Sequence, residues 1–221
     1  MTLKLYFHPL SSYCHKVLIA LYENEVPFQG QHINLMDPAA REDYLKISPF
    51  GKIPVLHDAK NDRIVLESSI IIEYLQQNYP GKVRLLPADP QARLEVRLKD
   101  RLFDLYLHQS MQKIVLEKLP PPGKGDPYGV EQARETLRTA YRRIDREMAG
   151  RTWAMGEEFT MADCSAAPPL FYGNQMMPLA PDFPNAAAYL QRLVQRPSYA
   201  RALREAEPFL KDFPGAAKSG A

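Results

Sequence analysis

The sequence predicts an α/β domain with a mixed four-stranded sheet, followed by an all-helical bundle. Two observations support this fold class. Up to about residue 80, the chain reads as strand, helix, strand, helix, strand, strand, helix. Beyond Pro90 almost no segment alternates with period two, and apolar residues recur at helical spacing instead.

The composition limits the possible functions. With 221 residues, 45% of them hydrophobic, the chain can form a substantial core. The 28 Lys and Arg residues nearly balance the 26 Asp and Glu residues, so no nucleic-acid partner is expected. No apolar stretch near the start approaches the roughly 20 residues that span a bilayer, and the N-terminus lacks a secretory pattern, so we expect a cytoplasmic protein that does not bind membranes. Cys14 and Cys164 form no metal-binding motif, so neither a structural metal nor a disulfide is expected.

The first strand and helix follow each other directly. Residues 3–8 alternate as in a strand, and Pro9 ends it. From Ser12 to about Asn24 a helix is expected, because four apolar residues recur at i, i+3, i+4 and i+7. These residues are Cys14, Val17, Leu18 and Leu21.

The rest of the N-terminal region completes a mixed sheet. Strands are predicted at residues 28–33, 54–58 and 63–66, and helices at residues 39–45 and 68–78. The helices are expected to join parallel strands, and the turn at residues 60–62 an antiparallel pair.

The helical region contains two long amphipathic segments. Each is predicted from one apolar stripe: Leu94, Leu98, Leu102 and Leu105 for the first, and Ala133, Leu137, Ala140, Tyr141, Ile144 and Met148 for the second. The first helix, from Pro90 to Leu119, is expected to have an outer face with Arg97, Arg101, Asp104 and His108. Pro168 and Pro169 should kink or end a third helix, and residues 185–195 and 198–206 should form shorter ones.

Three segments of the N-terminal region can support chemistry. The first is the turn before the first helix, where free backbone amides favour an anion and a serine hydroxyl can donate to a thiolate. Alternatively, Ser11 or Ser12 simply caps the helix. Cys14 lies on the apolar stripe, which favours a buried, inert thiol over a reactive one.

The second segment, residues 48–55, contains Gly51 and Pro54. Gly51 permits a tight turn. Pro54 either begins a strand or sits in a cis bend that leaves the main-chain groups of the preceding residue free to pair with a peptide. An ordinary loop is the alternative.

The third segment is Glu67 and Ser68, where a strand ends and a helix begins. Ser68 can be a simple N-cap. An acidic side chain beside a hydroxyl at a helix N-terminus can also hold an ammonium and a carboxylate together, as in an amino-acid end group.

From Leu3 to about Phe209, these segments in this order resemble the glutathione transferase superfamily, in particular its cytosolic, serine-using zeta-like, tau-like and bacterial members. The resemblance implies a thioredoxin-like, glutathione-binding domain at residues 1–80, a linker at residues 81–89, and an all-helical domain at residues 90–221 that forms a second-substrate pocket.

The resemblance also implies a role for each site residue. Ser11 would act on the thiol of glutathione, with Ser12 and Cys14 as the alternatives. The remaining glutathione-binding residues would be Lys52 at the glycyl carboxylate, Ile53 and a cis Pro54 at the cysteinyl part, and Glu67 and Ser68 at the γ-glutamyl end. Tyr106 and Met111 would line the second-substrate pocket.

A fourth match lies in the helical region. Residues 156–163 resemble the family's glycine-to-Thr-x-x-Asp element. Here the chemistry of the residues indicates a structural role, because Thr160 and Asp163 are spaced as a capping box.

The function implied is a glutathione transferase that conjugates the thiol of glutathione, as a co-substrate and without a metal, to small hydrophobic electrophiles. Such a reaction serves detoxification. A glutathione-dependent isomerase, a thiol reductase acting through Cys14, and a non-catalytic glutathione-binding or regulatory protein are the alternatives. The family also implies a homodimer, in which Asp104 of the neighbour approaches the γ-glutamyl amine.

Overall fold

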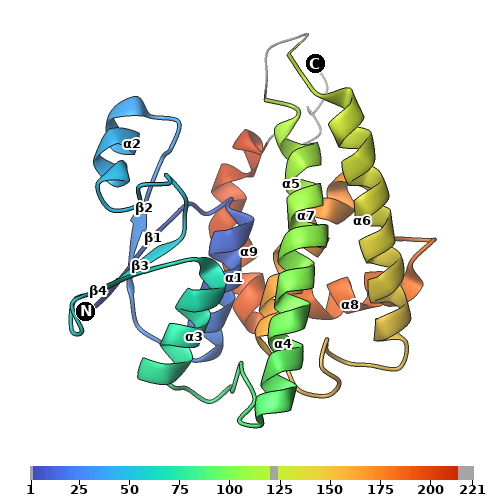
Figure 1. Cartoon of the computed structure of the whole chain (residues 1–221), viewed down its shortest axis with the longest axis horizontal. Coiled ribbons are helices and arrows are strands. Elements are labelled where there is room, and N and C mark those ends of the chain that lie inside the picture. The colour runs from blue at the N-terminus through green and yellow to red at the C-terminus, as the bar shows by residue number, and fades with distance from the viewer. Residues whose placement is uncertain (1, 120–123, 214–221) are drawn as a thin grey trace.

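The computed structural model describes residues 2–119 and 124–213, and its N-terminal part is a four-stranded sheet with three helices (Figure 1). The strands are β1 (Leu3–Phe7), β2 (Gln29–His32), β3 (Val55–Asp58) and β4 (Arg63–Leu66). The helices are α1 (Ser12–Glu23), α2 (Pro38–Leu45) and α3 (Ser68–Asn78). The predicted order of elements is confirmed.

The sheet is mixed, with strand order β2-β1-β3-β4. β1 is parallel to β2, and β3 is antiparallel to both β1 and β4. The first crossover, through α1, therefore joins parallel strands as predicted. The expectation for the second crossover is wrong, because α2 connects β2 to β3, which run in opposite directions with β1 between them.

The sheet presents one apolar face to α1 and α3. Side chains alternate along β1, where Leu3, Leu5 and Phe7 are buried. The predicted stripe of α1 is buried as well, and so is every residue from Cys14 to Leu21. The helix is covered all round because α1 packs against α3 on one side and against α7 and α9 of the helical part on the other (Figure 1).

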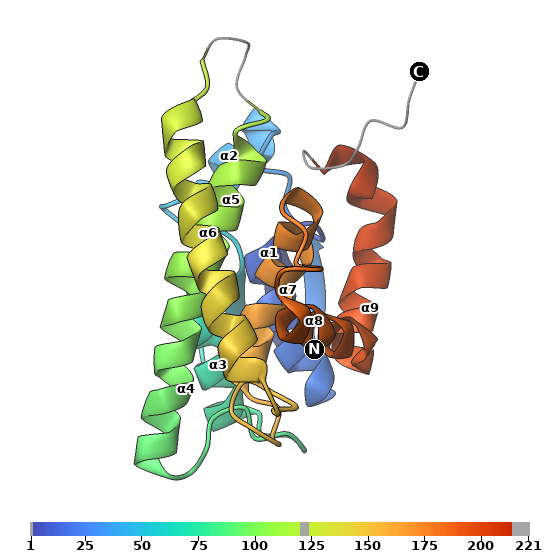
Figure 2. The same cartoon turned by 90° about the vertical axis from the view of Figure 1, so that its right-hand side faces the viewer.

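The C-terminal part is an all-helical bundle, as predicted (Figure 2). Its first long helix consists of α4 (Pro90–Leu102), a π-helical segment η1 (Phe103–His108) and α5 (Gln109–Leu116). The remaining helices are α6 (Pro127–Met148), α7 (Met161–Met176), α8 (Pro184–Gln195), α9 (Pro197–Ala206) and a 3-10 segment η2 (Glu207–Asp212). Residues 120–123 and 214–221 of the predicted helical domain lie outside the described residues.

The two long amphipathic helices differ in how well their apolar stripes predict burial. On α6 the stripe packs inward almost completely. The stripe of α4 and η1 does not pack inward, since Leu94, Leu98 and Leu105 are 56%, 46% and 38% exposed. The predicted outer face is wrong in part: Arg97 and Arg101 are exposed, but Asp104 is buried together with Asp100 and His108.

The third helix continues past its two prolines, so the alternative that it ends there is wrong. Pro168 and Pro169 lie inside α7, which neither ends at them nor is interrupted there, and both are buried. Tertiary packing outweighs the local penalty here, because α7 is the central helix and contacts α1, α4, η1, α5 and α8.

Candidate functional site

Ser11 sits at the turn between β1 and α1 and is the N-cap of α1. Its Oγ accepts a hydrogen bond from the Cys14 N–H at 3.4 Å, which confirms the capping interpretation. Capping uses an oxygen lone pair and leaves the hydroxyl hydrogen of Ser11 available to a ligand.

The next two residues contact the helical part. Ser12 Oγ lies 2.5 Å from Nε2 of His108, and the ring of Tyr13 stacks on the His108 ring with centroids 3.6 Å apart and planes 16° apart. Burial, with a smaller contribution from the Lys16 charge, lowers the pKa of His108 to about 3, so its imidazole is neutral at physiological pH. This contact was not predicted, because no local pattern in the sequence links residues 12 and 108.

Cys14 is a buried core residue, as its place on the apolar stripe predicts. Its side chain is fully enclosed. Burial raises the pKa of the thiol to about 12, and the Ser11 hydroxyl only partly offsets this effect. At neutral pH the sulfur is therefore a thiol, which is a poor nucleophile.

The loop before β3 contains a cis peptide bond between Ile53 and Pro54, as the resemblance implies. Gly51 has a φ of +60°, and its N–H closes a turn onto the Ser48 C=O. The Lys52 C=O accepts hydrogen bonds from the Tyr44 and Ser48 hydroxyls. Within the described chain, no hydrogen bond uses the N–H or C=O of Ile53, so both main-chain groups can pair with a peptide.

Glu67 forms the junction of β4 and α3. The alternative that Ser68 is a simple N-cap does not hold: Ser68 is the first residue of α3, and Glu67 occupies the N-cap position without a side-chain capping bond. Glu67 has φ +66° and ψ 122°, a conformation that non-glycine residues rarely adopt. The exposed carboxylate of Glu67 is held there at a backbone cost of about 1–3 kcal/mol.

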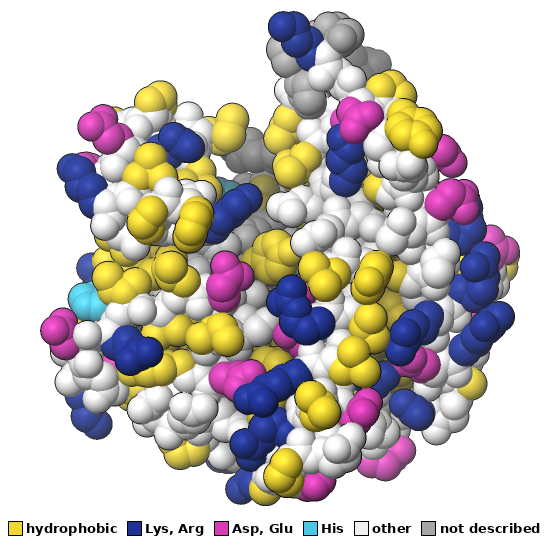
Figure 3. Space-filling view, in the orientation of Figure 1, with side chains coloured by type: hydrophobic (Ala, Val, Ile, Leu, Met, Phe, Trp, Pro, Cys, Tyr) yellow, Lys and Arg dark blue, Asp and Glu magenta, His cyan; other side chains and the backbone are white. Residues whose placement is uncertain are grey.

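These segments line one cavity of about 510 Å³ between the N-terminal loops and the first long helix. The polar cavity contains all six residues predicted to bind glutathione: Ser11, Lys52, Ile53, Pro54, Glu67 and Ser68. The helical part contributes Arg101, Asp104, Gln109 and Gln112. In Figure 3 the molecular surface is hollowed between α2 and the upper part of the long helix.

A second cavity, of about 280 Å³, adjoins the first and is mainly apolar. Five residues line both cavities: Ser11, Tyr13, Leu35, Ile53 and Gln112. The apolar cavity extends between α1 and α5, and Met111, which was expected to line a second-substrate pocket, contributes to its wall.

Tyr106 does not line this apolar cavity. It lies half exposed at a separate groove of about 310 Å³ between η1 and α6. Tyr106 and Met111 are five residues apart, so they lie on different faces of the long helix. The structure therefore does not bring the two predicted pocket residues together.

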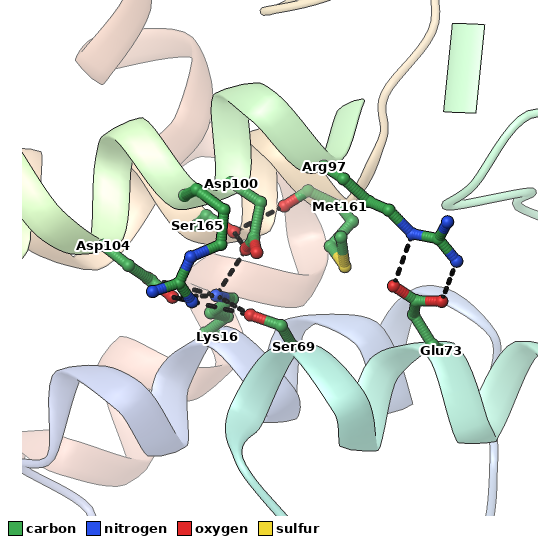
Figure 4. Close-up of polar contacts among 9 residues, drawn as sticks. Lys16, Ser69, Glu73, Arg97, Asp100, Asp104, Met161 and Ser165 are labelled. Atoms are coloured by element: carbon green, nitrogen blue, oxygen red, sulfur yellow. Dashed lines mark hydrogen bonds and ion pairs between the residues drawn. The ribbon is translucent and has the colours of Figure 1, made fainter. Parts of the chain in front are cut away.

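A buried polar network adjoins the polar cavity through Asp104, and no pattern in the sequence predicted it (Figure 4). Lys16, whose side chain is 1% exposed, forms ion pairs with Asp100 at 2.5 Å and Asp104 at 3.0 Å. It also donates a hydrogen bond to Ser69 at 2.8 Å. A buried charge is tolerated only when it is paired, so Lys16 draws both aspartates of the long helix inward.

Asp104 connects this network to the polar cavity. It lines the cavity of its own chain while its carboxylate contacts Lys16. Burial raises the pKa of Asp104, and the Lys16 charge opposes that shift. The sequence suggested no such pairing, because the periodicity alone placed Asp104 on an outer face.

Among residues 2–119 and 124–213, no three His, Cys, Asp or Glu side chains lie close enough together to bind a metal ion. Within the same residues, no helix is both long enough and apolar enough to cross a bilayer.

Comparisons with known proteins agree in both halves of the chain. Residues 5–83 match the family model described as "Glutathione S-transferase, N-terminal domain", and residues 127–192 match "Glutathione S-transferase, C-terminal domain". A stringent starvation protein A homolog of Coxiella burnetii is 31% identical over 216 residues, covering 96% of either chain. A glutathione S-transferase of Pseudomonas putida is 29% identical, covering 99% of both.

Solved structures give the same result. A glutathione S-transferase from Methylobacillus flagellatus, crystallised with glutathione bound, superposes with a TM-score of 0.83. It is 27% identical in sequence, and the match covers 90% of this chain and 98% of that one.

Proposed function

Because the chain belongs to the glutathione S-transferase superfamily, we propose that it binds glutathione in the polar cavity and conjugates its thiol to small apolar electrophiles held in the apolar cavity. The observation that supports this most directly is that the two cavities meet at Ser11. A peptide thiol and an apolar electrophile placed in these cavities would come into contact beside a hydroxyl.

In this proposal Ser11 donates a hydrogen bond to the sulfur of glutathione. A free thiol with a pKa of about 8.5 is only a few per cent ionised at pH 7, so a donor that favours the anion increases the population of the nucleophile. The thiol proton passes to solvent. The thiolate then forms a carbon–sulfur bond, and the leaving group departs with the electron pair of the bond that breaks.

The remaining residues of the polar cavity hold the peptide. The free main-chain groups of Ile53, beside Pro54, pair with the cysteinyl part. Lys52 meets the glycyl carboxylate. Glu67 and Ser68 bind the ammonium and carboxylate of the γ-glutamyl end. The charges of these side chains match the charges at the two ends of glutathione.

The site supports the three alternatives to different degrees. Thiol reduction through Cys14 is disfavoured by the burial and raised pKa of that thiol. A non-catalytic, glutathione-binding or regulatory protein remains the second candidate, because several relatives carry the name stringent starvation protein A. A glutathione-dependent isomerase would use the same cavities with a different second substrate.

Calorimetric titration with glutathione and a conjugation assay with 1-chloro-2,4-dinitrobenzene test the proposal. We expect binding and turnover in the wild type, loss of most turnover with retained binding in Ser11→Ala, and unchanged turnover in the matched Cys14→Ala. Binding without turnover favours the non-catalytic alternative. Loss of activity in a folded Cys14→Ala favours the reductase.

We further propose that each chain divides into a glutathione-binding domain at residues 1–80, a linker at residues 81–89 and a helical domain at residues 90–221. We also propose that the protein is cytoplasmic and forms a homodimer. The large exposed apolar side chains Phe50, on the N-terminal part, and Leu94 and Leu98, on α4, support the dimer.

A further inference from the structure

Tyr13 lies where the polar and apolar cavities meet. Of the five residues that line both, Ser11 and Tyr13 carry hydroxyl groups. The sulfur of a bound glutathione must reach this junction, since an electrophile in the apolar cavity can meet the peptide nowhere else. In the proposed function, Tyr13 therefore lines the space in which the thiol and the electrophile meet.

The ring of Tyr13 is held in place by the helical part. It stacks on His108, which is buried and paired with Ser12. Ser12 and Tyr13 begin α1 and His108 ends η1, so this contact spans the two halves of the molecule. A side chain fixed in this way needs little reorganisation to contact a ligand.

The hydroxyl of Tyr13 is available as a donor. Within the described chain it has no hydrogen-bond partner. Burial raises the pKa of Tyr13 above its usual range, and Asp104 and Glu67 add to this shift while Arg101 opposes it. Together with Lys52, these are the charged side chains that line the polar cavity. The phenol is therefore protonated at every pH at which glutathione chemistry takes place.

We propose that the Tyr13 hydroxyl is a second hydrogen-bond donor to the sulfur of bound glutathione, acting beside Ser11. This inference rests on the proposed function and adds a catalytic residue to it. Two neutral donors at one sulfur stabilise the thiolate more than one does. The proton of the thiol leaves to solvent, and neither hydroxyl ionises.

The test compares Tyr13→Phe, which keeps the stacked ring and removes only the oxygen, with Tyr6→Phe. Tyr6 is a half-buried tyrosine on β1 that lines neither cavity, so it is a matched control. The thiol pKa of bound glutathione is measured from the ultraviolet absorbance of the thiolate as a function of pH. Affinity for S-methylglutathione, which has no ionisable thiol, reports on the peptide site alone.

We expect Tyr13→Phe to raise the pKa of the bound thiol by about one to two units, which is roughly a ten- to hundredfold loss of ionised thiol at neutral pH. The kcat of conjugation should fall in parallel, while affinity for S-methylglutathione stays unchanged. Tyr6→Phe should match the wild type in all three measurements.

Two results would overturn the inference. One is a thiol pKa in Tyr13→Phe equal to that in the wild type. The other is a loss of S-methylglutathione affinity as large as the loss of kcat, which would make Tyr13 a structural residue. Failure of the wild type to bind glutathione at all refutes the proposed function instead, so the two failures are distinguishable.

Discussion

Glu67 combines a strained backbone with an exposed carboxylate in the polar cavity. A positive φ at a non-glycine residue persists only where the surroundings impose it, and such positions concentrate at functional sites. Here β4 ends directly before Glu67 and α3 begins directly after it, so the two elements dictate the turn. The strained turn holds the Glu67 side chain at the wall of the polar cavity.

We predict that Glu67→Ala weakens glutathione binding roughly ten- to a hundredfold, because it removes an ionic partner of the ammonium, worth about 1.5–3 kcal/mol. Calorimetry measures the affinity directly. Glu73→Ala is the matched control, since Glu73 lies on α3 and pairs with Arg97 (Figure 4), and neither residue lines the polar cavity. Equal affinities in the wild type and Glu67→Ala would remove Glu67 from the site.

At the scale of elements, the N-terminus of α7 depends on Asp163. The predicted capping box with Thr160 is present, and the Asp163 carboxylate accepts from the Thr160 N–H at 2.8 Å. The same buried carboxylate also accepts from the Ala154 N–H at 2.8 Å and the Tyr189 hydroxyl at 2.6 Å. One side chain thus connects α7 to the preceding loop and to α8.

We expect Asp163→Ala to lower the free energy of unfolding by about 2–4 kcal/mol, more than an ordinary cap, because it leaves several buried donors unpaired. Urea denaturation measures this loss. Glutathione affinity per folded molecule should not change. Glu158→Ala, an exposed position just before α7, should have no measurable effect. A loss below about 1 kcal/mol in Asp163→Ala would contradict the structural role.

Also at this scale, α1 and η1 pair through matched positions. Ser12 and Lys16 are one turn apart on α1, and they meet His108 and Asp104, which are one turn apart on η1. Because each polar side chain needs its partner, a shift of α1 along η1 by one turn would leave these buried polar groups unpaired. This pairing sets the position of the long helix relative to Ser11, and hence the junction of the two cavities.

For the whole molecule, the exposed apolar side chains give a test of the homodimer. Phe50 is 79% exposed on the N-terminal part, and the leucine stripe of α4 is exposed on the helical part. In the proposed dimer these two surfaces of neighbouring protomers cover each other.

We predict a mass near twice 25.2 kDa by light scattering at micromolar concentration. Phe50→Asp and Leu98→Asp should each shift the protein towards the monomer, because they would bury an unpaired charge in the interface. Tyr128→Asp changes an aromatic residue that is also exposed, at 75%, but lies elsewhere, and it should leave the dimer intact. A wild-type monomer would contradict the dimer.

The sequence by itself determined the order of elements, the mixed sheet, the helical bundle and the capping box of α7. These features depend on contacts within a few residues or on regular periodicity, which a linear chain displays directly. It also drew attention to the segments of Ser11, Ile53 and Glu67, because turns and helix starts have local signatures, but the residues alone left a cis Pro54 open and only the family resemblance implied it.

Only the tertiary structure decided which face of each helix is buried and which residues meet. Lys16 is charged yet buried, and it turns Asp100 and Asp104 inward, so the apolar stripe of α4 is left outside. Tyr13 was placed against His108 by the same packing of α1 on the long helix. The physical reason is that the pairing of buried charges and the packing of one helix on another depend on residues about 90 positions apart in the chain, and no local pattern encodes such contacts.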